Sequence, residues 1–246
     1  MHILTLIFAL LATTNPSDLS QQSSIDEILD ALDARGQNLK SFVADVKLGE
    51  TDTATGDDSS RSGQIWYQAG DQPKIHVVFD TKAANGKIAA DKIEYLLAGR
   101  DLIDRTYRTK TQVTRHVLKP GEKMNLLKLG EGPFPLPIGQ KKEDVHAAFD
   151  VKKIDPAKDD PPQTVHLQLT PKPDTQLDRR FKTIDVWIGF SDHMPQRIDT
   201  LDKNESTTRS TELKNVKINA NLPDENFTLP KIDAGDWQMI EEAFNN

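Results

Sequence analysis

Ten segments of the chain alternate apolar and polar residues, and this alternation limits the possible folds more than any other feature. In FVADVKL at 42–48, for example, Phe42, Ala44 and Val46 fall on one side of the pattern. A period of two sends alternate side chains to opposite faces, so each segment predicts a half-buried strand. The expected strands cover residues 41–50, 63–68, 74–82, 92–99, 101–109, 112–119, 164–170, 181–190, 196–203 and 206–218. Polar turns separate them, and an antiparallel sheet of this size tends to curl or close.

Three other segments have helical spacing. The first follows Ser24, which forms a capping box with Glu27, and we expect it to end at Gly36. The second is KKEDVHAAFDV at 141–151, where two apolar residues stand four apart. The third is the C-terminal tail, with apolar residues at Trp237, Ile240 and Phe244. The chain is therefore expected to be mainly β with a few helices.

Length and charge exclude several classes of protein. A chain of 246 residues fits one domain of ordinary size. Its net charge of −7 argues against a nucleic-acid binder, which needs a basic face. Cysteine is absent, so disulfides, thiolate metal sites and a cysteine-linked lipid anchor are excluded.

The N-terminus predicts export. Residues 3–12, ILTLIFALLA, are too few for a membrane span of about 20 residues but suit the core of a signal peptide. We expect a signal peptide at 1–16, a flexible leader at 17–23 and a single domain at 24–246. The alternative is that the apolar run forms a buried N-terminal strand.

The sequence contains no motif that indicates catalysis. None of the six histidines stands in a HxxxH or HExxH arrangement, so no metal site is indicated. A nucleophile elbow, a phosphate-binding loop and a dinucleotide fingerprint are also absent. We therefore expect no enzyme activity and no cofactor. A pair of carboxylates distant in sequence stays open as an enzymatic alternative.

The stretch GEGPFPLPIGQ at 130–140 is unusual because a loop rich in proline and glycine also carries three large apolar residues. Loops normally run over the surface and are polar. The stretch could plug an ordinary core or could cover an apolar cavity.

The order of the segments resembles that of the LolA-type periplasmic lipoprotein carriers, over about residues 25–229. GQIWY followed by Pro73 is similar to the family's Gly-x-Leu-Trp strand and its proline. AGRDLIDRTYRTKTQV resembles a second hairpin of the family, and FDVKKI with VHLQLTPK resembles its middle hairpin. The closing strands end in a similar signature that runs from Phe227 to Pro230.

The resemblance implies an incomplete antiparallel β-barrel, or strongly curved sheet, that helices cover as a lid. It places the 130–140 stretch in the lid, over a cavity for acyl chains. The residues then expected to bind lipid are Phe42, Val46, Ile65, Val77, Phe79, Tyr95, Leu97, Phe134, Leu136, Ile138, Val145, Phe149, Val186 and Ile188.

The implied function is that of a monomeric periplasmic carrier, a lipid-binding chaperone in lipoprotein transport. It would take the acyl chains of a lipoprotein or lipid from a releasing transporter in the inner membrane to an acceptor at the outer membrane. The alternative is a periplasmic sensor or regulatory binding protein on the same fold.

One position departs from the family. Its carriers typically hold an arginine three residues after the tryptophan of the second strand, where it latches the lid. Counting from Trp66 puts Ala69 there, or Gln68 if the register slips by one residue. Neither side chain offers a charged fork of five donors. We therefore expect a less firmly latched lid.

Overall fold

The structure is a computed structural model that describes residues 18–117 and 138–242. In these ranges twelve strands form one sheet. In sheet order they are β12 (Gln238–Glu242), β6 (Thr111–His116), β5 (Asp101–Thr106), β4 (Lys87–Ala98), β3 (Lys74–Ala84), β2 (Asp58–Gln68), β1 (Ser41–Asp52), β11 (Thr207–Ile218), β10 (Pro195–Asp202), β9 (Phe181–Gly189), β8 (Thr164–Pro171) and β7 (Phe149–Ile154).

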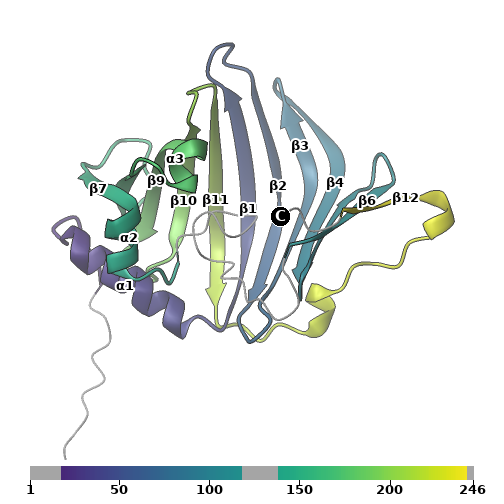
Figure 1. Cartoon of the computed structure of the whole chain (residues 1–246), viewed down its shortest axis with the longest axis horizontal. Coiled ribbons are helices and arrows are strands. Elements are labelled where there is room, and N and C mark those ends of the chain that lie inside the picture. Colours follow the sequence, from purple (N-terminus) through teal and green to yellow (C-terminus); the bar gives the residue numbers. More distant parts are fainter. Residues whose placement is uncertain (1–17, 118–137, 243–246) are drawn as a thin grey trace, which may run out of the picture.

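The sheet is curved and unclosed, with β12 at one edge and β7 at the other (Figure 1). All neighbouring strands are antiparallel except β12, which runs parallel to β6. The helices α1 (Ile25–Asn38) and α2 (Lys142–Ala148) contact each other and β7, and α3 (Gln176–Arg180) precedes β9. Two short 3₁₀ helices, η1 (Asp224–Phe227) and η2 (Ala234–Asp236), follow β11. The expected incomplete antiparallel barrel is confirmed.

Helix α1 begins as its sequence predicts. The Ser24 hydroxyl oxygen accepts from the Glu27 amide, and the Glu27 carboxylate accepts from the Ser24 amide, which completes the capping box. The buried stripe of the helix is formed by Ile28, Leu29, Ala31 and Leu32.

The expected end of α1 at Gly36 is wrong, because the helix continues to Asn38. Gly36 instead allows the backbone of residues 138–139 to approach. A Cβ on Gly36 would lie 2.0 Å from the Gly139 Cα, and the Gly139 amide donates to the Leu32 carbonyl at 3.1 Å. The glycine therefore serves packing rather than helix termination.

Residues 18–23, in the stretch expected to be a flexible leader, make contacts with the sheet. The amide of Leu19 donates to the Phe190 carbonyl at 2.8 Å, and the Leu19 side chain is buried. The side-chain Nε2 of Gln21 donates to the Thr164 carbonyl at 2.8 Å. These contacts fix the segment against the ends of β8 and β9.

The expected C-terminal helix is wrong, because its residues form β12. The Gln238 amide donates to the Lys110 carbonyl at 2.9 Å, and Gln238 to Glu242 pair in register with Thr111 to Arg115. An edge strand offers unpaired backbone groups to any neighbouring chain, and this pairing satisfies them on β6. Phe244 lies outside the described residues.

The sheet has an inner face that carries the main core and an outer face that is more polar. On the outer face, residues 219–242 run from β11 across β3–β6 and end in β12, in yellow in Figure 1. We call this segment the C-terminal strap. Under it, the His76 ring contacts the Asn226 carbonyl at 2.7 Å through Nδ1.

Replacing Gly36 by alanine should lower the melting temperature, although alanine is the better helix former by about 0.8–1 kcal/mol. The added methyl cannot fit at 2.0 Å from the Gly139 Cα, so α1 must shift. Gly49→Ala is the matched control, since its Cβ would meet atoms only at 3.8 Å or more. Thermal unfolding of both variants checks this prediction. A Gly36→Ala variant with the melting temperature of the wild type would contradict the close packing.

Acidification should destabilise the protein through two buried histidines. Burial lowers the pKa of His76 and of His193, and Arg35 also lowers that of His193. Asp18 and Asp192 oppose the shift at His193, as Glu94 does at His76. A histidine with a depressed folded pKa contributes stability above its unfolded pKa of about 6.5, and this is lost as pH falls toward the folded value.

The measurement is thermal unfolding between pH 7.5 and 5. His193→Asn keeps a residue that tolerates the positive φ of 52° at this position and removes the titrating ring. Its melting temperature should vary less with pH than that of the wild type. The exposed His146→Asn serves as the control for losing a histidine, and equal pH dependence in all three proteins would contradict the prediction.

Candidate functional site

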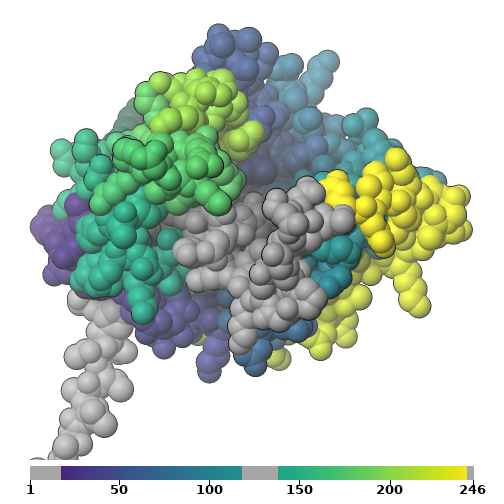
Figure 2. Space-filling view, viewed as in Figure 1, coloured from purple at the N-terminus to yellow at the C-terminus, as the bar shows by residue number. Residues whose placement is uncertain are grey.

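The inner face of β1–β4 is a continuous apolar floor. The side chains of Phe42, Ile65, Val77 and Phe79 are no more than 1% exposed, because strand alternation sends all of them to the same side. Register makes them neighbours: Val77 lies opposite Ile65 on one side and opposite Tyr95 on the other. The molecular surface seen from this side is hollowed between α3 with β10–β11 and the strands β1–β3 (Figure 2).

The structure brings the described lipid-binding candidates together. Eleven of them fall in one core cluster, and Tyr95 packs against it while remaining half-buried. Those eleven are Phe42, Val46, Ile65, Val77, Phe79, Leu97, Ile138, Val145, Phe149, Val186 and Ile188. Phe134 and Leu136 lie outside the described residues. The cluster is compatible with a ligand cavity, although such clustering is also what an ordinary core requires.

The half of the inner face beneath α1 and α2 is closely packed. The void between these helices and the sheet measures about 20 Å³. It is lined by Leu29, Leu32, Gln140, Val145, Leu167, Leu169, Val186 and Ile188. Ligand pockets usually measure about 300–1,000 Å³, so this void holds no acyl chain in the observed conformation. A ligand would enter here only if the helices moved away from the sheet.

Gln140 is an unusual part of this lining. Its Nε2 atom is buried and has no hydrogen-bond partner among the described residues. An unpaired buried amide costs about 1–3 kcal/mol, so the closed packing is not optimal at this point. The neighbouring Ile138 is fully buried, and Gly139 is hydrogen-bonded to α1. Residues 138–140 are thus anchored on the helix.

Charged pairs border the apolar floor. Arg61 lies four residues before Ile65 in β2 and donates to the Asp91 carboxylate at 2.9 Å. Asp104 lies opposite Tyr95 in register, and its pKa is raised because it is partly buried, although Arg115 at 3.6 Å opposes the shift. Burial also raises the pKa of the Tyr95 hydroxyl. A polar border beside an apolar floor suits an amphipathic ligand.

The position of the expected latch holds no cation. Ala69 packs against the core cluster, and its amide donates to the Lys40 carbonyl at 2.8 Å. Gln68 has a buried Oε1 atom without a hydrogen-bond partner in the described part of the chain. Neither residue can supply the charged donors with which the family's arginine latches the lid.

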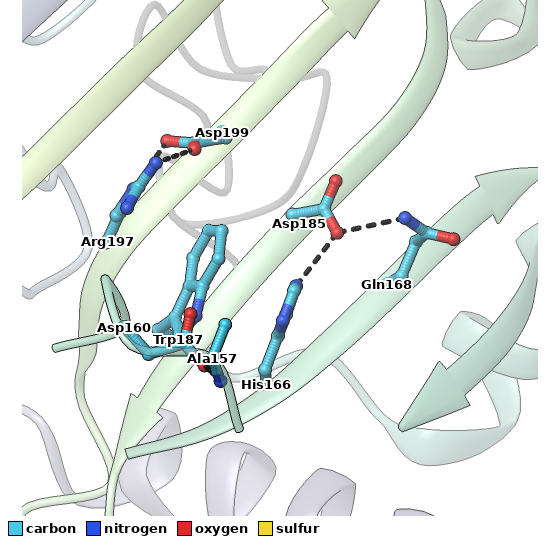
Figure 3. Close-up of polar contacts among 8 residues, drawn as sticks. All are labelled: Ala157, Asp160, His166, Gln168, Asp185, Trp187, Arg197 and Asp199. Atoms are coloured by element: carbon cyan, nitrogen blue, oxygen red, sulfur yellow. Dashed lines mark hydrogen bonds and ion pairs between the residues drawn. The ribbon is translucent and has the colours of Figure 1, made fainter. Parts of the chain in front are cut away.

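A cluster on the outer face was missed by sequence reasoning. The Trp187 indole is stacked between the His166 ring at 4.1 Å and the Arg197 guanidinium at 4.5 Å (Figure 3). Its Nε1 donates to Asp160 at 2.7 Å, which attaches the 155–163 loop to the sheet. Four segments supply these groups, and no spacing in the sequence connects them.

The cluster's polar groups are mostly paired with one another. Asp185 accepts from Gln168 at 3.1 Å and contacts His166 Nε2 at 2.8 Å, and Arg197 donates to Asp199 at 3.0 Å (Figure 3). A groove of about 600 Å³ lies beside it, lined by both acidic and basic residues. With its hydrogen bonds made internally, the cluster is explained by loop attachment.

Neither a metal site nor a membrane span is found in the described ranges. Within residues 18–117 and 138–242, no three His, Asp or Glu side chains gather closely enough to hold a metal ion. In the same ranges, no helix has both the length and the hydropathy to cross a bilayer.

Comparison with known proteins supports the fold without identifying the chain. No protein-family model and no curated protein sequence matches it. Among solved structures, an uncharacterized conserved protein from Thermus thermophilus has a TM-score of 0.50 at 13% identity, with 89% of this chain and 100% of that chain covered.

Two further matches are more distant. A LolA superfamily protein from Nitrosomonas europaea gives a TM-score of 0.32 at 12% identity, with 84% of this chain and 98% of that one covered. The complex of MucA and MucB from Pseudomonas aeruginosa gives a TM-score of 0.43 at 10% identity, with 83% of this chain and 60% of that chain covered. At these identities the likeness concerns the fold alone.

Proposed function

We propose that the protein is a periplasmic carrier that shelters acyl chains of a lipoprotein or lipid against the inner face of its sheet. The observation that carries the proposal is the apolar floor of β1–β4, continuous with the helix-covered half of the same face. Burying an acyl chain of about 16 carbons is worth roughly 0.8 kcal/mol per CH₂, which is on the order of 10 kcal/mol in all. An apolar cavity supplies that shelter without covalent chemistry.

Loading requires the packed half to open. The void beneath α1 and α2 is about 20 Å³, so acyl chains enter as the helices separate from β8 and β9. Among the described residues the Gln140 Nε2 atom has no hydrogen-bond partner, and Ala69 supplies no charged donor. The closed state is therefore less stable than it would be with a partner for Gln140 and a cation at position 69. The partners that this role requires are a releasing transporter in the inner membrane and an acceptor at the outer membrane.

Val77→Phe should weaken binding of a fluorescent fatty-acid probe by about tenfold or more. Val77 lies in the middle of the floor and is fully covered in the observed conformation, so the larger ring takes the space that the ligand needs once the cover moves away. Overpacking a buried site also costs about 1–3 kcal/mol of stability, and in an ordinary core this loss would be the whole effect. Probe displacement and thermal unfolding, measured on the same samples, separate the two cases.

The matched control is Val78→Phe, because the next residue of β3 points to the outer face and is half-buried. It should leave probe affinity unchanged. If Val77→Phe lowers the melting temperature and leaves probe affinity as it was, the floor is an ordinary core and the carrier proposal fails. Native mass spectrometry of protein purified from its own periplasm would also show the mass of any lipid that is bound to it.

Export should remove the first residues of the chain. The apolar run at 3–12 predicts a mature N-terminus between about residues 13 and 24. N-terminal sequencing of protein from a periplasmic fraction tests this. Recovery of the chain with Met1 in place, or its absence from that fraction, would contradict the proposed location.

A further inference from the structure

The C-terminal strap is held to the outer face by few buried side chains. Phe227 is buried, but from Thr228 to Glu242 no residue is, and Met239 is 48% exposed. Segments with little buried apolar surface open locally at low free-energy cost. The strap beyond Phe227 is therefore the part of the sheet assembly that can be replaced most easily.

The surface beneath the strap is largely polar, although Leu96, opposite His76 in register, is a buried apolar residue on the same face, and this polarity favours replacement. His76, Glu94, Arg105 and Gln112 are buried there, with residue exposures between 2% and 8%. These groups can hydrogen-bond to water when the strap leaves, whereas exposing an apolar surface to water would cost free energy. Arg105 shows how the strap is bound: its guanidinium donates to the Pro230 carbonyl at 2.6 Å and to Gln112 at 2.7 Å. The Pro230 contact involves a backbone oxygen, which any extended peptide could supply.

The aromatic and charged contacts of the strap define what else could bind. Trp237 packs edge-on against Tyr107 at 5.2 Å, with the Arg105 guanidinium 5.9 Å from its ring. Asp236 pairs with Lys110 at 3.3 Å, and Glu242 pairs with Arg115 at 2.7 Å. The strap thus presents a carboxylate, an aromatic ring and a short strand that ends in a second carboxylate.

We infer that β6 and the adjoining Arg105 surface form a docking site for an extended acidic segment of a partner protein. The segment adds to β6 as a parallel strand in place of β12, with its carboxylates on Lys110 and Arg115 and an aromatic side chain on Tyr107. Strand addition to a sheet edge gives affinity through main-chain hydrogen bonds, and side-chain contacts give specificity. The strap is then the internal competitor that occupies the site until such a partner arrives.

The site lies on the outer face and at the β6 edge, and it meets the border of the apolar floor at Arg115, which also pairs with Asp104. The variants below leave Arg115 in place, so partner binding and acyl-chain binding can be tested independently. The internal strap lowers the apparent affinity for the partner by the fraction of time that the site is free.

The test uses the full chain and a fluorescein-labelled peptide with the strap sequence LPKIDAGDWQMIEE (residues 229–242). Gln238→Pro removes the amide that donates to the Lys110 carbonyl, so β12 pairs less well with β6. Peptide affinity should rise about tenfold or more over the wild type. Hydrogen exchange at residues 111–116 should quicken without peptide and slow again when it is bound. Met239→Ala, at an exposed position, is the control and should behave as the wild type.

A charge exchange tests specificity. Lys110→Glu in the Gln238→Pro chain should lower the affinity for the wild-type peptide at least about fivefold, which is within the range of measured charge-pair energies. The same variant should bind a peptide that carries Asp236→Lys more tightly than the wild-type peptide. Fatty-acid probe affinity should remain unchanged in all these variants. The inference is overturned if the amides of β6 exchange hydrogen faster in Gln238→Pro but the variant binds no peptide. It is also overturned if peptide affinity does not change when the charges at Lys110 and Asp236 are swapped. A wild-type dimer that dissociates on Gln238→Pro would assign the surface to a second copy of the chain and also overturn it.

Discussion

β1 pairs with β11 along its whole length, from Phe42 opposite Ile218 to Asp52 opposite Thr207. The two strands come from opposite ends of the chain, so this pairing joins a hairpin series at 41–116 to another at 149–218. Everything else depends on it. Only when both halves form one sheet do their apolar faces meet as a single surface, and only then can α1 lie against β7 while the strap returns across β3 to β6.

The two faces of that sheet carry different chemistry. The inner face is apolar and is closed by helices over one half, and the remaining void is lined by a Gln140 amide that finds no hydrogen-bond partner in the described part of the chain. The outer face holds buried polar groups, an indole clamped between an imidazole and a guanidinium, and a strap bound largely through backbone and ion-pair contacts. An apolar face favours a ligand that avoids water. A polar face with an occupied edge favours an exchangeable peptide.

Local patterns in the sequence predicted the local structure well, because strand alternation and helix capping act over a few residues. Each of the ten expected strands is present, and the capping box at Ser24 and Glu27 starts α1 as predicted. The errors came where tertiary contacts override local preference. Gly36 looked like a helix end but provides space for Gly139, and the spacing of Trp237 and Ile240 looked helical but the free edge of β6 draws the tail into a strand.

The sequence alone indicated which side of a strand is apolar where the alternation is clean, as it does for Phe42, Ala44 and Val46 in β1. In β2 and β3, apolar residues such as Trp66 and Val78 stand next to Ile65 and Val77, so the pairing of the strands decided which side faces inward. Only the tertiary structure decided how closely that face is covered. The void beneath α1 and α2, the stack around Trp187 and the seat of the strap on Arg105 each join segments distant in the chain. Contacts of this kind arise from strand order and sheet curvature, which no local pattern of residues encodes.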